Sequence, residues 1–478
     1  MRAAGAWKDR PALLFQDSQW TFSSLLEDAA AIASRLREFG VATGNRVGVI
    51  SPNHPRQVLA YYAIMLCGAI VVPINHRLQS EEIVNQVKYS KTGFLFHDAN
   101  IELPSSLPET IHTCELTEFK SGSGVEKTTV ESHSRFTSEQ ICAIFFTSGT
   151  TGRPKAVPLT YKNFVTSATG SALHLGTTAE DLWLACLPLD HIGGFSILMR
   201  SLFSGFAVNL HKSFHPHRVV QDIRELKVTS ISLVPTMLRR LIEAGLSGPQ
   251  KLKFILLGGG PVPDTLINKS INLNLPVCPT YGLTEACSQV TTVPPGEIQS
   301  KQGTAGKPLP MVSVEIRGEE GKSLGAGKTG AIYIKGPTVI QGYLDDSGQM
   351  TENYHNEWLP TGDYGYLDQD GYLYPESRRN DLIVTGGENV NPVEVEIAFH
   401  EIAGVKDICV FGLPHEEWGE IITAAVVLSD EFSLQQLHKI RLHGLAGFKH
   451  PKQFFRVQTI PKTSLGKPKR NQLRKQFS

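Results

Sequence analysis

Apolar and polar residues alternate along the first half of the chain in a pattern that predicts helices and strands in turn. A hydroxyl-rich start at 19–26 leads into an apolar-periodic run that continues to Leu36, which predicts a capped helix. An apolar segment at 44–51 predicts a strand, a helix is expected from about Pro55, and 69–74 predicts the next strand. Two strands that flank a helix in this way predict a β-α-β unit within a parallel sheet.

The same alternation continues to about residue 257. Further strands are predicted at 93–96, 141–146 and 181–188, with a helix from Gly194 and two more α/β alternations over 207–257. A polar stretch at 103–138 lacks periodicity, so we expect a surface excursion there rather than a domain boundary.

After residue 305 the pattern changes to short strands and turns. These predicted strands lie at 312–316, 331–334 and 371–374. A polar break at 376–381 then precedes a small α+β segment. We therefore predict the α/β class, with a large domain over 1–379 of mixed sheets flanked by helices plus a β-rich subdomain. A small mobile α+β domain over 380–478 would act as a lid.

Composition and charge exclude several kinds of partner. Lys and Arg total 46, as do Asp and Glu, which gives no electrostatic argument for nucleic acid or an anionic membrane surface.

The uncharged stretch 58–74 is shorter than the roughly 20 residues that a spanning helix needs. The N-terminus lacks the apolar core of a secretory signal, and seven cysteines without a C-x-x-C pair predict buried reduced thiols. We expect a cytoplasmic protein without a membrane span, and we leave a homodimer or higher oligomer open.

Glycines and hydroxyl residues are concentrated in one loop after the predicted strand at 141–146. The loop reads Thr147-Ser-Gly-Thr-Thr-Gly-Arg-Pro-Lys155. Glycine permits turns in which successive N–H groups point into one concavity, and the hydroxyls and Lys155 add donors and charge. These features predict a polyphosphate site. The spacing is not that of a Walker A loop, and the alternative is a flexible surface loop.

Two further motifs follow predicted strands. In 280–285, Tyr281 could cover a purine, Thr284 could donate to a phosphate, and Glu285 could hold Mg²⁺ at a strand-to-helix turn. The glycines at 258–260 would allow a flat ligand to approach the backbone. For both motifs the alternative is a simple turn.

Two charged motifs lie nearer the C-terminus. Asp363 could accept bidentate hydrogen bonds from a ribose diol, and Arg378 could support the same sugar. Lys467 lies in a basic segment at 461–470, for which the alternative is a solvated tail.

In order and spacing, these motifs resemble the adenylate-forming superfamily of acyl- and aryl-CoA synthetases, luciferases and adenylation domains over essentially the whole chain. The resemblance implies that ATP, Mg²⁺ and a carboxylate give an acyl-adenylate and pyrophosphate, and that coenzyme A then gives a thioester. It implies catalytic roles for Thr284 and for Glu285, the latter as the Mg²⁺ ligand. The residues that it assigns to the nucleotide are Thr147, Ser148, Gly149, Thr150, Thr151, Gly152, Lys155, Gly259, Gly260, Tyr281, Gly282, Asp363 and Arg378.

The resemblance also implies a domain rotation between the two half-reactions. Lys467 would first bridge the substrate carboxylate and the α-phosphate, where its charge matches the transition state. Rotation about a hinge at Asn380 would then withdraw Lys467 and bring Gly386 and Gly387 to the pantetheine tunnel. The family commonly has Asp or Lys at the hinge, and Asn tolerates unusual backbone angles.

We expect the segment 187–194 and the helix after it to contact the substrate. Position 190 is usually aromatic in the family but is Asp here, and we expect His191 to contact the substrate near its reacting carboxylate. Arg200 interrupts an apolar helix, which is costly unless an anion pairs with it, so it suits a second substrate carboxylate. The alternatives are an internal salt bridge or a surface arginine.

Segments 232–238, 256–263 and 281–292 are most similar to o-succinylbenzoate–CoA ligases, whose substrate is an aromatic dicarboxylate. The predicted substrate contacts are His191, Ser196, Arg200, Ser288 and Thr292. The alternatives are another aryl- or fatty-acyl-CoA ligase, a carrier-loading adenylation domain and a luciferase-like oxygenase. We expect no metal at His211, His215 and His217, and interpret them as surface histidines at a strand end.

Overall fold

The computed structural model describes residues 6–78, 80–118, 137–147, 155–260, 262–352, 357–378, 383–385, 388–415, 418–442, 445, 447–463 and 466–478. Contacts group the chain into two compact units. Unit 1 comprises Met1–Gly258, Asp264–Val314 and Ile334–Leu359, and unit 2 comprises Gly259–Pro263, Glu315–Tyr333 and Pro360–Ser478. The predicted division at residue 380 is a different one and stays a prediction.

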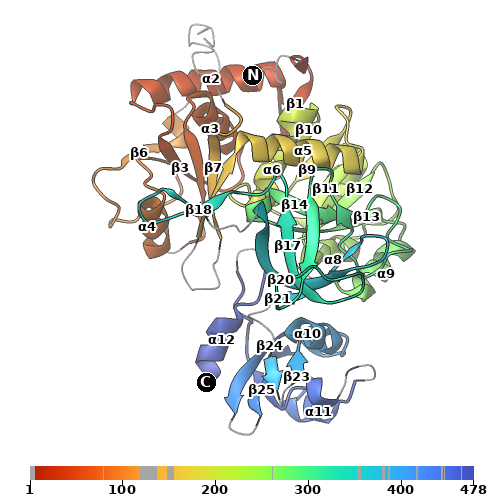
Figure 1. Cartoon of the computed structure of the whole chain (residues 1–478). Coiled ribbons are helices and arrows are strands. Elements are labelled where there is room, and N and C mark those ends of the chain that lie inside the picture. The colour runs from red at the N-terminus through yellow and green to blue at the C-terminus, as the bar shows by residue number, and fades with distance from the viewer. Residues whose placement is uncertain are drawn as a thin grey trace. The chain divides into compact units, whose positions relative to one another are not determined.

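Unit 1 contains a nine-stranded mixed sheet in the order β15-β14-β13-β12-β11-β9-β10-β1-β2 (Figure 1). Strands β13 to β1 pair in parallel, whereas β2, β14 and β15 are antiparallel to their neighbours. The central strands are short apolar runs, as expected of parallel strands covered on both faces. The strands are β1 Pro11–Phe15, β2 Ser18–Thr21, β9 Leu182–Ala185, β10 Ala207–Leu210, β11 Ser230–Leu233, β12 Phe254–Leu257, β13 Val277–Leu283, β14 Ser288–Thr292 and β15 Lys307–Pro308.

An eight-stranded sheet in unit 1 has the order β19-β18-β8-β7-β4-β3-β5-β6. Strand β3, helix α3 and strand β4 confirm the predicted β-α-β unit, with β3 parallel to β4. Strand β8, which was not predicted, runs antiparallel to β7. The strands are β3 Arg46–Ile50, β4 Ile70–Ile74, β5 Phe94–His97, β6 His112–Glu115, β7 Ile141–Thr147, β8 Lys155–Thr160, β18 Gly342–Leu344 and β19 Met350–Glu352.

Capping residues define where the helices of unit 1 begin. At α2, Thr21 accepts from the Ser24 N–H while Ser24 accepts from the Thr21 N–H, so the predicted capped helix is confirmed. Helix α5 was not predicted, although Thr160 and Asn163 form the same reciprocal cap. The helices are α2 Phe22–Glu38, α3 Pro55–Leu66, α4 Ser80–Tyr89, α5 Tyr161–Leu175, α6 Ile192–Ser204, α7 Pro216–Glu225, α8 Pro235–Glu243 and α9 Asp264–Asn272.

One apolar core joins the two large sheets of unit 1. Phe195 of α6 lies at its centre and is fully buried. Its ring lies 5.2 Å from the rings of Tyr61 and Phe145 and 5.4 Å from that of Phe164. These contacts fix α6, which carries several predicted substrate residues, against α3, β7 and α5.

A four-stranded sheet has the order β16-β17-β20-β21. Its strands are β16 Ser313–Arg317, β17 Gly330–Lys335, β20 Leu359–Leu367 and β21 Leu373–Arg378. This arrangement confirms the predicted change to short strands and turns after residue 305.

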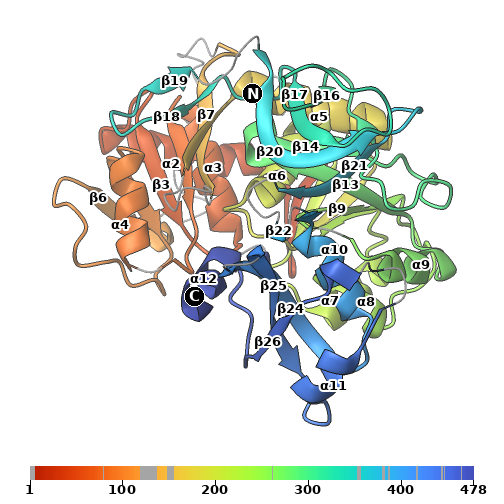
Figure 2. The ribbon, with the colours of Figure 1, turned by 60° about the horizontal axis from the view of Figure 1, so that its bottom comes forward.

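The C-terminal part of unit 2 is built on a sheet in the order β23-β22-β25-β24, with β26 parallel to β25. Alternate side chains of β24 point to opposite faces: Val410 packs in a core with α10 and α11, and Phe411 packs in a core with α12. Figures 1 and 2 accordingly show α11 and α12 on opposite sides of this sheet. The elements are β22 Ile383–Thr385, β23 Glu388–Val390, α10 Pro392–His400, β24 Val405–His415, β25 Gly419–Leu428, α11 Leu434–Lys439, β26 Gln453–Arg456 and α12 Arg470–Phe477.

Two sequence expectations concern the whole chain. Among the described residues, no helix is both long enough and apolar enough to cross a membrane. All seven cysteines are free and six are buried, which confirms the prediction of buried thiols.

Candidate functional site

The predicted phosphate loop connects two antiparallel strands. Thr147 ends β7, Lys155 begins β8, and the two residues are direct pairing partners. Ser148, Gly149, Thr150, Thr151 and Gly152 lie outside the described residues. The strand register therefore brings the hydroxyl and the cation at the two ends of the loop together.

Lys155 belongs to a cluster that the sequence did not reveal. Its ammonium lies 4.6 Å from the centre of the Tyr343 ring, a cation–π contact. The Tyr343 hydroxyl donates to Glu285 Oε1 at 3.1 Å. Strand β18 carries Tyr343 and pairs with β8, and this tertiary pairing gives no local sequence signal. The phosphate-loop cation and the predicted magnesium ligand thus share one aromatic partner.

The predicted strand-to-helix turn at 280–285 is wrong. Strand β13 continues to Leu283, a single 3₁₀ turn covers Thr284–Ala286, and β14 returns antiparallel to β13. Cys287 adopts a left-handed conformation at φ 57°, which ends the helical turn at once. A Cβ on Gly282 would lie 1.7 Å from the Ser288 carbonyl oxygen, so this close hairpin requires glycine. Tyr281, Thr284 and Glu285 all remain partly exposed on the hairpin.

The predicted ribose residues lie on neighbouring strands of unit 2. Asp363 of β20 is the pairing partner of Arg378 of β21, so the two backbones meet across the ladder. The Asp363 N–H donates to Thr361 Oγ1 at 3.1 Å.

The predicted adenine glycines differ in backbone conformation. Gly259 has a φ of +83°, in the region that favours glycine, and a Cβ on Gly260 would meet nothing within 4 Å. Both glycines lie just after β12, from which Gly258 separates them.

His191 lies at the N-cap of α6 and has a partner that was missed. Its Nε2 lies 3.1 Å from Asn75 Nδ2, at the end of β4. Asn75 Oδ1 already accepts the Arg77 N–H at 2.8 Å, so the amide NH₂ is the group that faces the imidazole. Nε2 therefore accepts, and neutral His191 carries its proton on Nδ1. Asn75 follows a predicted parallel strand, which is the only sequence signal for it.

Arg200 is buried, with 3% of its surface exposed. Its Nη2 donates a long hydrogen bond of 3.4 Å to Ser288 Oγ, and its guanidinium carbon lies 5.6 Å from the Trp183 ring centre. Nε is buried without a hydrogen-bond partner, and among the described residues no ion pair joins Arg200 to a carboxylate. Burial lowers the pKa of Arg200 to about 10, which leaves it charged at neutral pH. The interpretation as a surface arginine is therefore wrong.

Of the other predicted substrate residues, Ser288 contacts Arg200, and Ser196 and Thr292 have partners of their own. Ser288 follows Cys287 with φ 92°, a second consecutive left-handed conformation that only the surrounding hairpin maintains. Ser196 is buried and its hydroxyl donates to the Gly193 carbonyl at 3.3 Å. The Thr292 hydroxyl is enclosed, at 2.9 Å from both Thr280 Oγ1 and Gln289 Nε2. Direct substrate contact by these residues stays a prediction.

The interpretation of His211 as a surface residue is wrong. It is 8% exposed, and its Nε2 lies 2.9 Å from Asp222 Oδ2. Asp222 also pairs with Arg218, one turn earlier on α7, at 3.0 Å. The carboxylate lies on the helix that packs over the strand end, which sequence spacing alone does not show. Among the described residues, no group of three His, Cys, Asp or Glu could hold a metal.

Lys467 lies on an exposed turn that precedes α12. Its carbonyl accepts the Thr463 N–H at 2.8 Å, and its N–H donates to Thr463 Oγ1 at 3.2 Å. Asn380, Gly386 and Gly387 lie outside the described residues. The hinge and the thiol loop therefore stay predictions.

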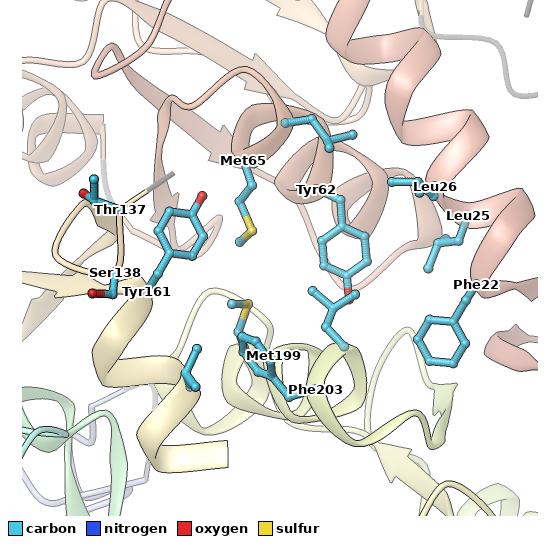
Figure 3. A pocket seen from close by; sticks show the side chains of 13 residues that line it. Phe22, Leu25, Leu26, Tyr62, Met65, Thr137, Ser138, Tyr161, Met199 and Phe203 are labelled. Carbon is cyan, nitrogen blue, oxygen red and sulfur yellow. The ribbon is translucent and has the colours of Figure 1, made fainter. Parts of the chain in front are cut away.

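A cavity of about 310 Å³ lies elsewhere in unit 1. Figure 3 shows that helices α2, α3, α5 and α6 surround it and that most of the side chains lining it are apolar. Phe22, Met65 and Phe203 are among these residues. Neither Arg200 nor His191 lines it, so this cavity is separate from the predicted substrate residues.

Comparison with known proteins covers nearly the whole chain. The family model for AMP-binding enzyme matches residues 1–344, and the model for the AMP-binding enzyme C-terminal domain matches residues 394–467. The 2-succinylbenzoate–CoA ligase of Bacillus velezensis is 38% identical over 97% of this chain and 95% of its own length. The enzyme of the same name from Bacillus subtilis is 35% identical over 99% and 96%.

Solved structures agree with these matches. The o-succinylbenzoate CoA synthetase of Bacillus subtilis in complex with its acyl-adenylate intermediate superposes with a TM-score of 0.92, at 35% identity over 99% of this chain and 97% of that chain. The same synthetase in complex with ATP and magnesium ion also gives a TM-score of 0.92, over 99% and 98%. These matches confirm the predicted α/β class and superfamily. The chain belongs to the AMP-binding enzyme family.

Proposed function

We propose that this protein is an AMP-forming acid–thiol ligase that converts o-succinylbenzoate, ATP and coenzyme A into o-succinylbenzoyl-CoA, AMP and pyrophosphate. Its membership of the AMP-binding enzyme family supports the reaction class. Relatives that bear the ligase name match over nearly their full length, which supports the substrate. The free thiols and balanced charge fit a cytoplasmic enzyme.

Buried Arg200 is the observation that carries the choice of substrate. A guanidinium that has left water without a carboxylate partner loses solvation, which an anion replaces best. A carboxylate on the substrate would satisfy the buried Nε and the weakly bonded Nη2 together, in bidentate geometry. A fatty acid has no second carboxylate and would leave the cation unpaired.

His191 would bind the reacting end of the substrate. With Nε2 engaged by Asn75, the Nδ1–H is the free donor, and it can stabilise the carboxylate that attacks the α-phosphate. Arg200 lies further along the same helix, α6. We infer that α6 holds both ends of a dicarboxylate.

The residues around Glu285 fit a magnesium ion that travels with ATP. Glu285 is partly exposed and offers carboxylate oxygen, the ligand type that Mg²⁺ prefers. Since no three-residue metal cluster exists among the described residues, substrate phosphates and water would complete the coordination. When bound, the ion neutralises phosphate charge. Lys155 and the loop hydroxyls would bind the same phosphates, while Gly259, Gly260, Tyr281, Gly282, Asp363 and Arg378 would contact the nucleoside.

Lys467 would act in the first half-reaction alone. Its ammonium would stabilise negative charge shared by the carboxylate and the α-phosphate while the acyl-adenylate forms and pyrophosphate leaves. A rotation at Asn380 would then replace it with Gly386 and Gly387 for attack by the coenzyme A thiolate, which releases AMP. The exposed turn that carries Lys467 is compatible with such an exchange.

A substrate panel tests this proposal. CoA-dependent AMP release would be measured with o-succinylbenzoate, benzoate, 4-coumarate, and medium and long fatty acids. We expect release with o-succinylbenzoate alone. Faster turnover of a monocarboxylate would keep the reaction class and overturn the substrate, whereas AMP release that needs a carrier protein instead of CoA would overturn the ligase.

A further inference from the structure

The turn that carries Lys467 is tied to the rest of unit 2 by an ion pair on each side. Before the turn, Lys462 Nζ lies 2.5 Å from Asp407 Oδ2. After it, Arg470 Nη2 lies 2.6 Å from Glu396 Oε2. The second pair is the more enclosed, since its side chains are 13% and 10% exposed against 34% and 23% for the first. Water and salt therefore disturb it less.

The buried pair closes a ring of hydrogen bonds across three elements. Glu396 of α10 also accepts the Val410 N–H of β24 through Oε1 at 2.7 Å. Arg470, the first residue of α12, also donates from Nε to the Val410 carbonyl at 2.8 Å. Each charged group thus has at least two partners, and the guanidinium cannot rotate without breaking both of these bonds.

Short backbone contacts connect this ring to Lys467. The Lys469 N–H, at the N-cap of α12, donates to the Pro461 carbonyl at 2.8 Å. Thr463 bonds the Lys467 backbone on the same turn, at 2.8 Å. Only Pro468 and Lys469 separate Arg470 from Lys467, so the bonded turn follows directly into the residue that the ring holds.

We infer that Glu396 is a positioning residue for Lys467. Through Arg470 it fixes the start of α12, and so the point from which the Lys467 ammonium reaches the reacting carboxylate and phosphate. This inference rests on the proposed role of Lys467. Displacement of a charged group by about 1 Å is enough to slow a reaction by about 100-fold, so an indirect anchor of this kind can control rate.

A role in folding alone predicts a different outcome. Helix α12 also has an apolar attachment, since Leu473 is 1% exposed and the Phe477 ring stacks on Phe455 at 4.2 Å. These contacts keep the helix on the sheet when the ion pair is lost. Loss of Glu396 should therefore displace the Lys467 turn while the domain stays folded.

Glu396→Gln in the full-length chain tests the inference. Single-turnover acyl-adenylate formation from o-succinylbenzoate and ATP should fall about 10- to 100-fold. Thioester formation from supplied acyl-adenylate and CoA should stay within about twofold. Glu394→Gln is the matched control: it makes the same exchange on α10 and removes the partner of Lys449, at 2.6 Å, and it should leave both rates unchanged.

Arg470→Lys provides a second test if Glu396→Gln does not fold. Lysine keeps the charge but loses the Nε contact with Val410, so a smaller loss confined to adenylation is expected. Equal loss in both half-reactions, or unchanged adenylation in a folded variant, would overturn the inference. Lys467→Ala distinguishes a failure of the proposed role of Lys467 from a failure of the Glu396 anchor. If it also slows both halves equally, the proposed role of Lys467 fails; if it slows adenylation alone while Glu396→Gln does not, only the anchor fails.

Discussion

The Tyr343 hydroxyl donates a hydrogen bond to Glu285 Oε1 at 3.1 Å, although the two residues lie on elements far apart in the sequence. The same tyrosine ring lies under Lys155. Tyr343 therefore contacts both the proposed magnesium ligand, through its hydroxyl, and the proposed phosphate cation, through its ring.

Tyr343→Phe should weaken the use of Mg²⁺. A hydrogen bond to a charged group contributes about 1.5 kcal/mol, so adenylation should fall roughly tenfold and the Mg²⁺ concentration for half-maximal rate should rise. The measurement is a magnesium titration of pyrophosphate release. Tyr366→Phe, in a stacked tyrosine pair of unit 2, is the control and should not shift the titration. An unchanged magnesium requirement in Tyr343→Phe would contradict this role.

Asn75→Ala should act through His191. Loss of the amide donor frees the imidazole to change tautomer, and a hydrogen bond of about 1 kcal/mol corresponds to a roughly fivefold lower kcat for adenylation. If Asn75 acts only through His191, the double variant Asn75→Ala/His191→Ala should be no slower than the single variant His191→Ala. Additive losses would mean that Asn75 acts independently of the histidine.

The sequence predicted the parts of this site that local chemistry specifies. The strand before the phosphate loop, a hydroxyl-capped helix start within 19–26 and the β-α-β unit follow from periodicity and caps, and the structure confirms them. The hairpin after Tyr281 did not follow, because its geometry depends on the close approach of Gly282 to Ser288 across two strands.

Partners of site residues were missed for a related reason. Tertiary packing alone brings Tyr343 to Glu285 and Asn75 to His191. It also brings Glu396 to Arg470, which lies three residues after Lys467. Helix α5 was different: the Thr160–Asn163 cap was present in the sequence and was overlooked. Site chemistry was thus easier to predict than the contacts that orient it.

Burial of His211 predicts a pH-dependent stability. Desolvation lowers the pKa of His211 below the ordinary 6.5, and the hydrogen bond that its ring donates to the Asp222 carboxylate opposes this only in part. Since the folded pKa is the lower one, the unfolded chain binds more protons as the pH falls below about 6.5, and stability decreases from there through the folded pKa. The pKa values of His54, His76 and His174 are lowered in the same direction by burial.

Thermal unfolding followed between about pH 7 and pH 5 should therefore show a falling Tm. His211→Gln should reduce the slope, because one of the groups that take up protons on unfolding is removed. The exposed His215 lies on the same segment, and His215→Gln is the control that should keep the wild-type slope. The same slope in all three proteins would contradict the assignment to His211.

The central claim is that Arg200 selects a second carboxylate, and kcat/KM for matched substrates tests it most directly. The substrates are o-succinylbenzoate and two analogues that each lack one carboxylate, 4-oxo-4-phenylbutanoate and 2-butanoylbenzoate, assayed with the wild type and Arg200→Ala. The wild type should prefer the dicarboxylate by about 100-fold over the analogue that keeps the reacting carboxylate, the cost of leaving a buried charge unpaired, and the analogue without the reacting carboxylate should give no product. Arg200→Ala should reduce that preference over the reactive analogue to within about threefold. An equal preference in both proteins would contradict the account.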